Sequence, residues 1–187
     1  MPVAATDLMQ LRRRNTFSIG LMIALSSWAL IFFTLAWGYV VFRLRAASWL
    51  GDYLSPSVRW IAIANTLAIA ASSWSLSNFF KKDAQRFDAW AWGSFVFGLV
   101  FLAGQFYLWQ VLMRAGLHWQ TSIAGSMFFL LTGFHALHIL GGLTAVLILC
   151  RRIKQWRGTL TALGIKYFWD FLLIVWFVLF VLIFIIQ

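Results

Sequence analysis

The sequence predicts an all-α, polytopic membrane protein: a single domain, residues 1–187, built as a bundle of five transmembrane helices. Composition and patterning lead to this fold class. Of the 187 residues, 63% are hydrophobic and only 11% are charged, and the mean hydropathy is +0.85. A soluble protein of this size needs more polar surface, so the surplus apolar side chains are expected to face lipid. The apolar residues fall into five long runs, and the basic residues gather between them.

Each of the five runs is long enough to cross a bilayer. The hydrocarbon core is about 30 Å thick, which takes about 20 mostly apolar residues in a helix. Helices are expected because backbone groups in hydrocarbon must form their hydrogen bonds within their own segment. The predicted spans are residues 19–41, 60–79, 89–113, 122–150 and 163–186.

Two of the runs carry further expectations. The first is too long for the apolar part of a signal peptide and no clean cleavage site follows it, so it is predicted to remain as a helix. The fourth is longer than a bilayer requires, which predicts a tilted helix or one that projects beyond the lipid. Both prolines lie outside the runs, so no span is expected to have a proline kink.

The distribution of Lys and Arg predicts the orientation. Eleven basic residues lie on the side of the N-terminus: Arg12, Arg13, Arg14, Lys81, Lys82, Arg86, Arg151, Arg152, Lys154, Arg157 and Lys166. Only four lie on the other side: Arg43, Arg45, Arg59 and Arg114. The positive-inside rule then places the N-terminus in the cytoplasm and the C-terminus outside. This topology explains the net charge of +10, so no nucleic-acid partner is expected.

Few residues in the chain can do chemistry. The single cysteine, Cys150, rules out an internal disulfide or a cysteine-based zinc cluster. Two of the three histidines, His135 and His138, lie three residues apart in the fourth run and share a helical face, which continues through Gly141, Gly142 and Ala145. They could bind haem or a metal or relay protons, or they could hydrogen-bond across a helix interface. No third ligand is visible in another run, so no catalytic, cofactor-binding or metal-binding residue is predicted.

The remaining polar residues inside the runs favour helix packing. Uncharged side chains such as Asn65, Ser72, Ser73 and Gln105 suit hydrogen bonds between membrane helices. Asp170 is the one acidic residue inside a run, and it is expected in the first turn of the fifth helix, where the helix dipole favours it and Lys166 can pair with it. Proton conduction needs a chain of ionisable partners, which the sequence lacks.

One stretch of the fourth run resembles a known family. Phe128 and Phe129, followed by Thr132-Gly133-Phe134-His135-Ala136-Leu137-His138, closely resemble the signature of subunit III of the haem-copper oxidases (cytochrome c oxidase subunit 3, in its short five-helix bacterial form). A basic loop follows, as in the family, with Arg151 and Arg152. Weaker similarities occur in the expected order along nearly the whole chain. They include Tyr39, Asn65, Ser72, Ser73, Gln105, Trp169 and Trp176.

The chain departs from the family at acidic positions. Trp28 stands where the family's first conserved helix has a buried Glu, and Leu108 stands where its third has a Glu. In the last helix Asp170 replaces the family's His and Leu173 replaces its Asp. Any role of those carboxylates in proton handling is therefore not carried over, and the sequence offers no reason for their loss.

The resemblance implies a non-redox subunit in a bacterial inner membrane. Its partners would be subunit I, which holds haem and copper, and subunit II. It would hold phospholipid and support the stability and proton uptake of subunit I, with its Gly, His, Trp and polar residues serving packing or lipid contact. Three alternatives stay open. They are subunit III of a quinol oxidase or an accessory protein of nitric oxide reductase, a small transporter or enzyme, and an autonomous lipid-binding protein.

Overall fold

In the computed structural model the chain is helical throughout the part described, residues 5–46, 49–81, 86–120 and 122–186, and no strand occurs there. The elements are α1 (Ala5–Arg45), η1 (Gly51–Tyr53), α2 (Pro56–Phe79), α3 (Phe87–Arg114), α4 (Ile123–Arg151), α5 (Ile153–Trp156), α6 (Leu160–Phe180) and η2 (Val181–Ile185). The predicted all-α class is confirmed. Lys82, one of the residues used to predict the orientation, lies outside the described residues.

Four helices in the described residues are both long and apolar enough to cross a membrane. They are Leu8–Arg45, Phe87–Arg114, Ile123–Arg151 and Leu160–Ile185. The predicted second span, 60–79, lies in α2, which has 24 residues but is less apolar. The reason is that α2 turns several polar side chains inward. Buried polar residues of α2 are Asn65, Thr66, Ser72, Ser73, Ser75 and Asn78.

Side-chain caps fix where three of the helices begin. The hydroxyls of Ser55, Ser122 and Thr159 accept a backbone N–H three residues ahead, as N-cap residues do. α2 also has Pro56 in its first turn, where the missing N–H costs nothing. Because of these caps, α2 and α6 begin a few residues before the predicted spans.

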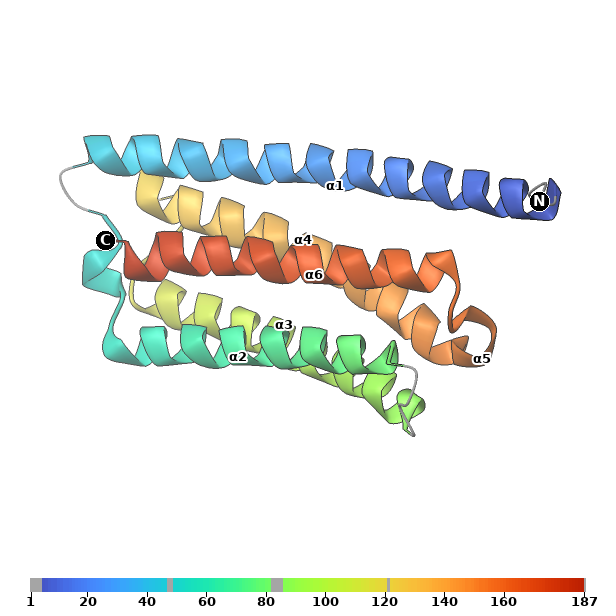
Figure 1. Cartoon of the computed structure of the whole chain (residues 1–187). Helices are drawn as coiled ribbons and strands as arrows, with labels where there is room; N and C mark the ends of the chain where they lie inside the picture. The colour runs from blue at the N-terminus through green and yellow to red at the C-terminus, as the bar shows by residue number, and fades with distance from the viewer. Residues whose placement is uncertain (1–4, 47–48, 82–85, 121, 187) are drawn as a thin grey trace.

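α1 is longer than a bilayer requires. Its 41 residues make a helix of roughly 60 Å at about 1.5 Å per residue. The part of α1 before the predicted span, residues 5–18, contains no Gly or Pro, so nothing in it ends the helix. α1 packs mainly against α4 and α6, and most of its surface is exposed in this chain. Figure 1 shows its N-terminal part extending past the end of α6.

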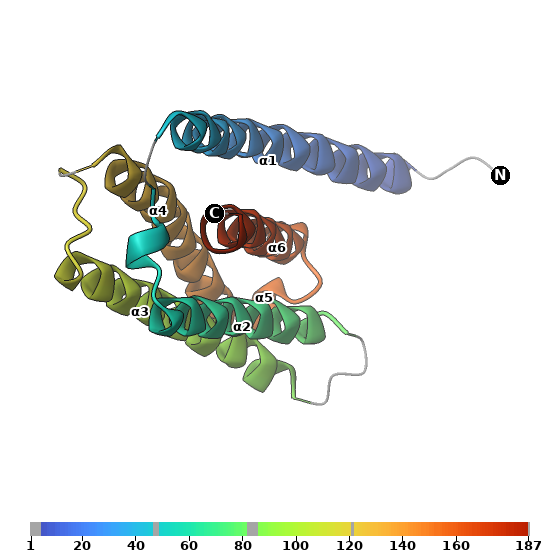
Figure 2. The same cartoon turned by 90° about the vertical axis from the view of Figure 1, so that its left-hand side faces the viewer.

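The long helices lie side by side, with α6 in the middle (Figures 1 and 2). α6 contacts α1, α2 and α4, while α3 packs mainly on α2 and also on α4. The N-terminal end of α1 and the C-terminal end of the chain lie at opposite ends of the bundle. The two largest side chains that are fully buried, Trp169 and Trp176, both come from the central α6. The interior is therefore built around this helix.

Candidate functional site

The interior of the bundle is joined by hydrogen bonds from tryptophans of α6. The indole nitrogen of Trp169 donates to the hydroxyl of Ser72 on α2 at 3.1 Å, and that hydroxyl donates to the carbonyl oxygen of Ser94 on α3 at 2.6 Å. About two turns further along α6, the indole nitrogen of Trp176 donates to the hydroxyl of Thr66 at 2.9 Å. Each indole thus packs an apolar body between helices and satisfies its one polar atom there.

Glycines make the space for the Trp169 ring. A Cβ atom on Gly98 of α3 would lie 3.0 Å from Trp169 Cζ2, and one on Gly142 of α4 would lie 2.8 Å from its Cζ3. The ring is therefore held between the backbones of two helices at distances that no larger residue allows. Trp169 of α6 therefore contacts α2, α3 and α4.

Asp170 links α6 to α2. The hydroxyl of Ser73 donates to Oδ1 of Asp170 at 2.5 Å, and Lys166 Nζ lies 2.5 Å from Oδ2. The expected pairing with Lys166 is thus present. The expected position in the first helical turn is wrong, because the Thr159 cap starts α6 at Leu160 and leaves Asp170 near the middle of the helix. The carboxylate is held by its two partners and not by the helix dipole.

The two histidines of α4 have different surroundings. His135 is 1% exposed and stacks on Trp176, with ring centroids 5.6 Å apart. His138 is half-buried toward α1, where its ring meets the edge of Trp28 at 5.5 Å, and its Nδ1 lies 2.8 Å from the carbonyl oxygen of Phe134. In the described residues no three His, Cys, Asp or Glu side chains come together in a way that could hold a metal ion.

The other residues singled out in the sequence fall into three groups. Asn65 and Gln105 are buried in the same central region as His135. Gly133 has nothing within 4 Å of the place of a Cβ atom, so it makes no close helix contact within this chain. Arg151 and Arg152 are exposed at the end of α4.

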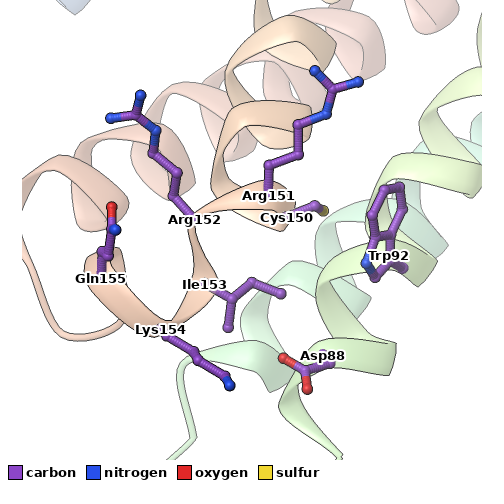
Figure 3. A pocket seen from close by; sticks show the side chains of 8 residues that line it. All are labelled: Asp88, Trp92, Cys150, Arg151, Arg152, Ile153, Lys154 and Gln155. Carbon is purple, nitrogen blue, oxygen red and sulfur yellow. The ribbon is translucent and has the colours of Figure 1, made fainter.

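Arg151 and Arg152 line a pocket of about 450 Å³ between α3 and the α4–α5 corner. Figure 3 shows Asp88 and Trp92 of α3 on one side, and Lys154 of α5 on the other. The two arginine side chains point away from Asp88. Three basic residues and one acidic residue give this end of the bundle a positive rim.

Several residues of the interior received no packing role from the sequence. The carbonyl oxygen of Ser94 accepts the hydrogen bond from the Ser72 hydroxyl, and Gly98 makes room for the ring of Trp169. The hydroxyl of Thr132 accepts a hydrogen bond from the indole of Trp109 at 3.0 Å. Ser94 and Gly98 lie one turn apart on the buried face of α3, in series with Phe101 and Gln105. That spacing predicts that the four residues share one face of the helix.

Trp28 and Leu108, the two positions where the resemblance implies a Glu, both take part in apolar packing. Leu108 is fully buried in an apolar cluster, and Trp28 packs on His138 and Phe168. An ionised carboxylate at Leu108 would be cut off from water, which is costly without a partner. Both positions have become part of apolar packing.

Comparison with known proteins identifies the chain. No protein-family model matches it. It is 33% identical over 188 residues to a probable cytochrome c oxidase subunit 3 of Mycobacterium bovis, which covers 95% of this chain and 91% of the relative. A probable cytochrome c oxidase subunit 3 of Nocardia farcinica is 33% identical with the same coverage, and the cytochrome c oxidase subunit 3 of Thermostichus vulcanus is 27% identical over 90% of this chain and 87% of its own length.

The fold and its interior define a helical membrane protein whose buried polar groups join its helices to one another. The chain belongs to the cytochrome c oxidase subunit 3 family. The resemblance in the sequence of α4 is thereby confirmed.

Proposed function

We propose that the chain is the non-redox subunit III of a respiratory haem-copper oxidase in a bacterial inner membrane, packed on the catalytic subunit I. The observation that carries the proposal is its similarity to subunit 3 of cytochrome c oxidases over almost its whole length. In this role haem and copper belong to the partner subunits, and this chain holds no cofactor of its own. Its task is to stabilise subunit I and to support proton uptake by it.

The proposal includes five membrane crossings: the four helices that are apolar enough to span a membrane, and α2 in addition. α2 lies along α3 and contacts α6, and its polar side chains face the other helices. An odd number of crossings accounts for the two ends of the chain lying at opposite ends of the bundle (Figure 1). The distribution of basic residues supports an N-terminus in the cytoplasm, by the positive-inside rule.

The proposal also includes lipid contact at the basic rim. Arg151, Arg152 and Lys154 surround a pocket at the predicted cytoplasmic end of α4 (Figure 3). Anionic headgroups attract basic residues near the surface by about 1 kcal/mol each. The exposed apolar side of α1 supplies a surface for acyl chains or for subunit I.

Purification of the tagged chain from its native membrane in mild detergent tests this function. We expect it to bring with it a large subunit with many spans that carries haem, visible in a reduced-minus-oxidised spectrum. A tagged membrane protein unrelated to respiration serves as the control. Recovery of the chain alone and colourless, under conditions that keep other respiratory complexes intact, would contradict the proposal and favour a transporter or an autonomous lipid-binding protein.

A further inference from the structure

A layer of polar side chains without partners crosses the middle of the bundle. Nδ2 of Asn65, both side-chain polar atoms of Gln105 and both ring nitrogens of His135 are buried and have no hydrogen-bond partner in the structure. These residues come from α2, α3 and α4, and they are 4%, 1% and 1% exposed. They account for all such atoms found in the described residues.

The contacts among the helices put these side chains at one level. Asn65 Oδ1 lies against Gly104, the residue before Gln105. One turn before Gln105, Phe101 meets the rings of both His135 and Trp176, with centroids 6.0 and 4.8 Å away. Trp176 in turn donates to Thr66, the neighbour of Asn65. The layer therefore passes from α2 through α3 to α4, and it lies near the centre of the predicted spans.

The hydroxyl groups near this layer do not donate hydrogen bonds to its unpaired acceptor atoms. Thr66 donates its proton to the carbonyl oxygen of Ala62 at 2.8 Å, and Thr132 donates to that of Phe128 at 2.7 Å. The acceptor atoms of Gln105 and His135 are therefore left without a donor from a hydroxyl. Unpaired polar groups are most costly at this depth, where no bulk water reaches them.

The donors and acceptors among the unpaired atoms determine which kind of ligand can bind there. The amide nitrogens of Asn65 and Gln105 need an acceptor, whereas Oε1 of Gln105 and the unprotonated nitrogen of His135 need a donor. A cation would leave the N–H groups unpaired, and an anion would leave the acceptors unpaired. Water both donates and accepts, and buried waters usually occupy sites with two to four such partners.

We propose that this layer holds at least one ordered water molecule, hydrogen-bonded between Asn65, Gln105 and His135. The water joins α2, α3 and α4 inside the membrane, next to the hydrogen bond from Trp176 of α6 to Thr66. The proposal concerns this chain's own interior, so it stands or falls independently of the partner subunits.

Radiolytic hydroxyl labelling of the purified complex in lipid nanodiscs tests the proposal, because X-rays generate hydroxyl radicals from water next to a side chain. Phe101 and Phe128 are both fully buried in apolar clusters and have the same intrinsic reactivity, but Phe101 also contacts the ring of His135 in the layer. We expect Phe101 to be hydroxylated several-fold faster than Phe128. Equal labelling of the two would overturn the proposal.

A double substitution locates the water. Gln105→Leu with His135→Phe should lower the labelling of Phe101 to that of Phe128, whereas Ser94→Ala, which removes a buried hydroxyl outside the layer, should leave it unchanged. Persistent labelling of Phe101 in the double variant would refute these residues as the water's partners. If that variant fails to assemble, a high-resolution cryo-electron-microscopy map of the unaltered complex decides. Density within hydrogen-bond reach of two of the three side chains supports the proposal, and direct bonds between the side chains without such density overturn it.

Discussion

Replacing Trp169 with alanine should destabilise the folded chain by about 3–5 kcal/mol, the range found when a buried Trp or Phe is truncated. Trp169 is fully buried, and the ring fills the space between Gly98 and Gly142. Its loss leaves a cavity between four helices and removes the bond to Ser72. The free energy of unfolding, measured for the purified chain by denaturant titration in mixed micelles, checks this value.

Trp60→Ala is the matched control for that experiment. Trp60 lies on α2 and is 70% exposed, so the same truncation removes surface contact and leaves no internal cavity. We expect it to change the free energy of unfolding by much less than Trp169→Ala. Equal losses at the two positions would show that burial in this bundle does not determine the effect.

Two adjacent glycines of α4 should respond oppositely to the same substitution. A Cβ atom on Gly142 would lie 2.8 and 2.9 Å from ring atoms of Trp169, which Gly98 confines from its other side. Gly142→Ala should therefore destabilise the chain by about 1–3 kcal/mol through overpacking. Gly141 has nothing within 4 Å of a Cβ position, so Gly141→Ala should gain up to about 1 kcal/mol from helix propensity.

The same unfolding titration measures both glycine variants side by side. The sign of the difference carries the test, because helix propensity favours alanine equally at the two positions. Stabilisation by Gly142→Ala, or a loss at Gly141 as large as that expected at Gly142, would contradict the packing of Trp169 between α3 and α4.

The sequence was a good guide where a single helix determines the outcome. Apolar runs gave the long helices, and spacing of four residues predicted the Lys166–Asp170 pair, which the structure contains. It failed for Asp170's place in its helix, because the cap that starts α6 is Thr159 and the run of apolar residues begins later. The start of a helix depends on local hydrogen bonds more than on hydropathy.

Properties that depend on which helix packs beside which were not predictable. His135 and His138 share a helical face, yet one stacks on Trp176 of α6 and the other meets Trp28 of α1. Gly133 and Gly142 are both glycines of α4, but of the two only Gly142 touches another helix of this chain. The helical period does not separate the two histidines, whose different neighbours arise from tertiary contacts. It does put Gly133 and Gly142 on opposite faces of α4, but it does not tell which of the two faces meets another helix.

The central claim is that this chain supports the oxidase without taking part in electron transfer. The most direct measurement compares the oxidase purified with and without the chain, recording haem content, copper content, and activity through repeated turnover. We predict equal haem and copper per subunit I, a similar initial rate, and a faster loss of activity in the complex that lacks the chain. Loss of a haem or copper centre, or equal durability of the two complexes, would contradict the claim.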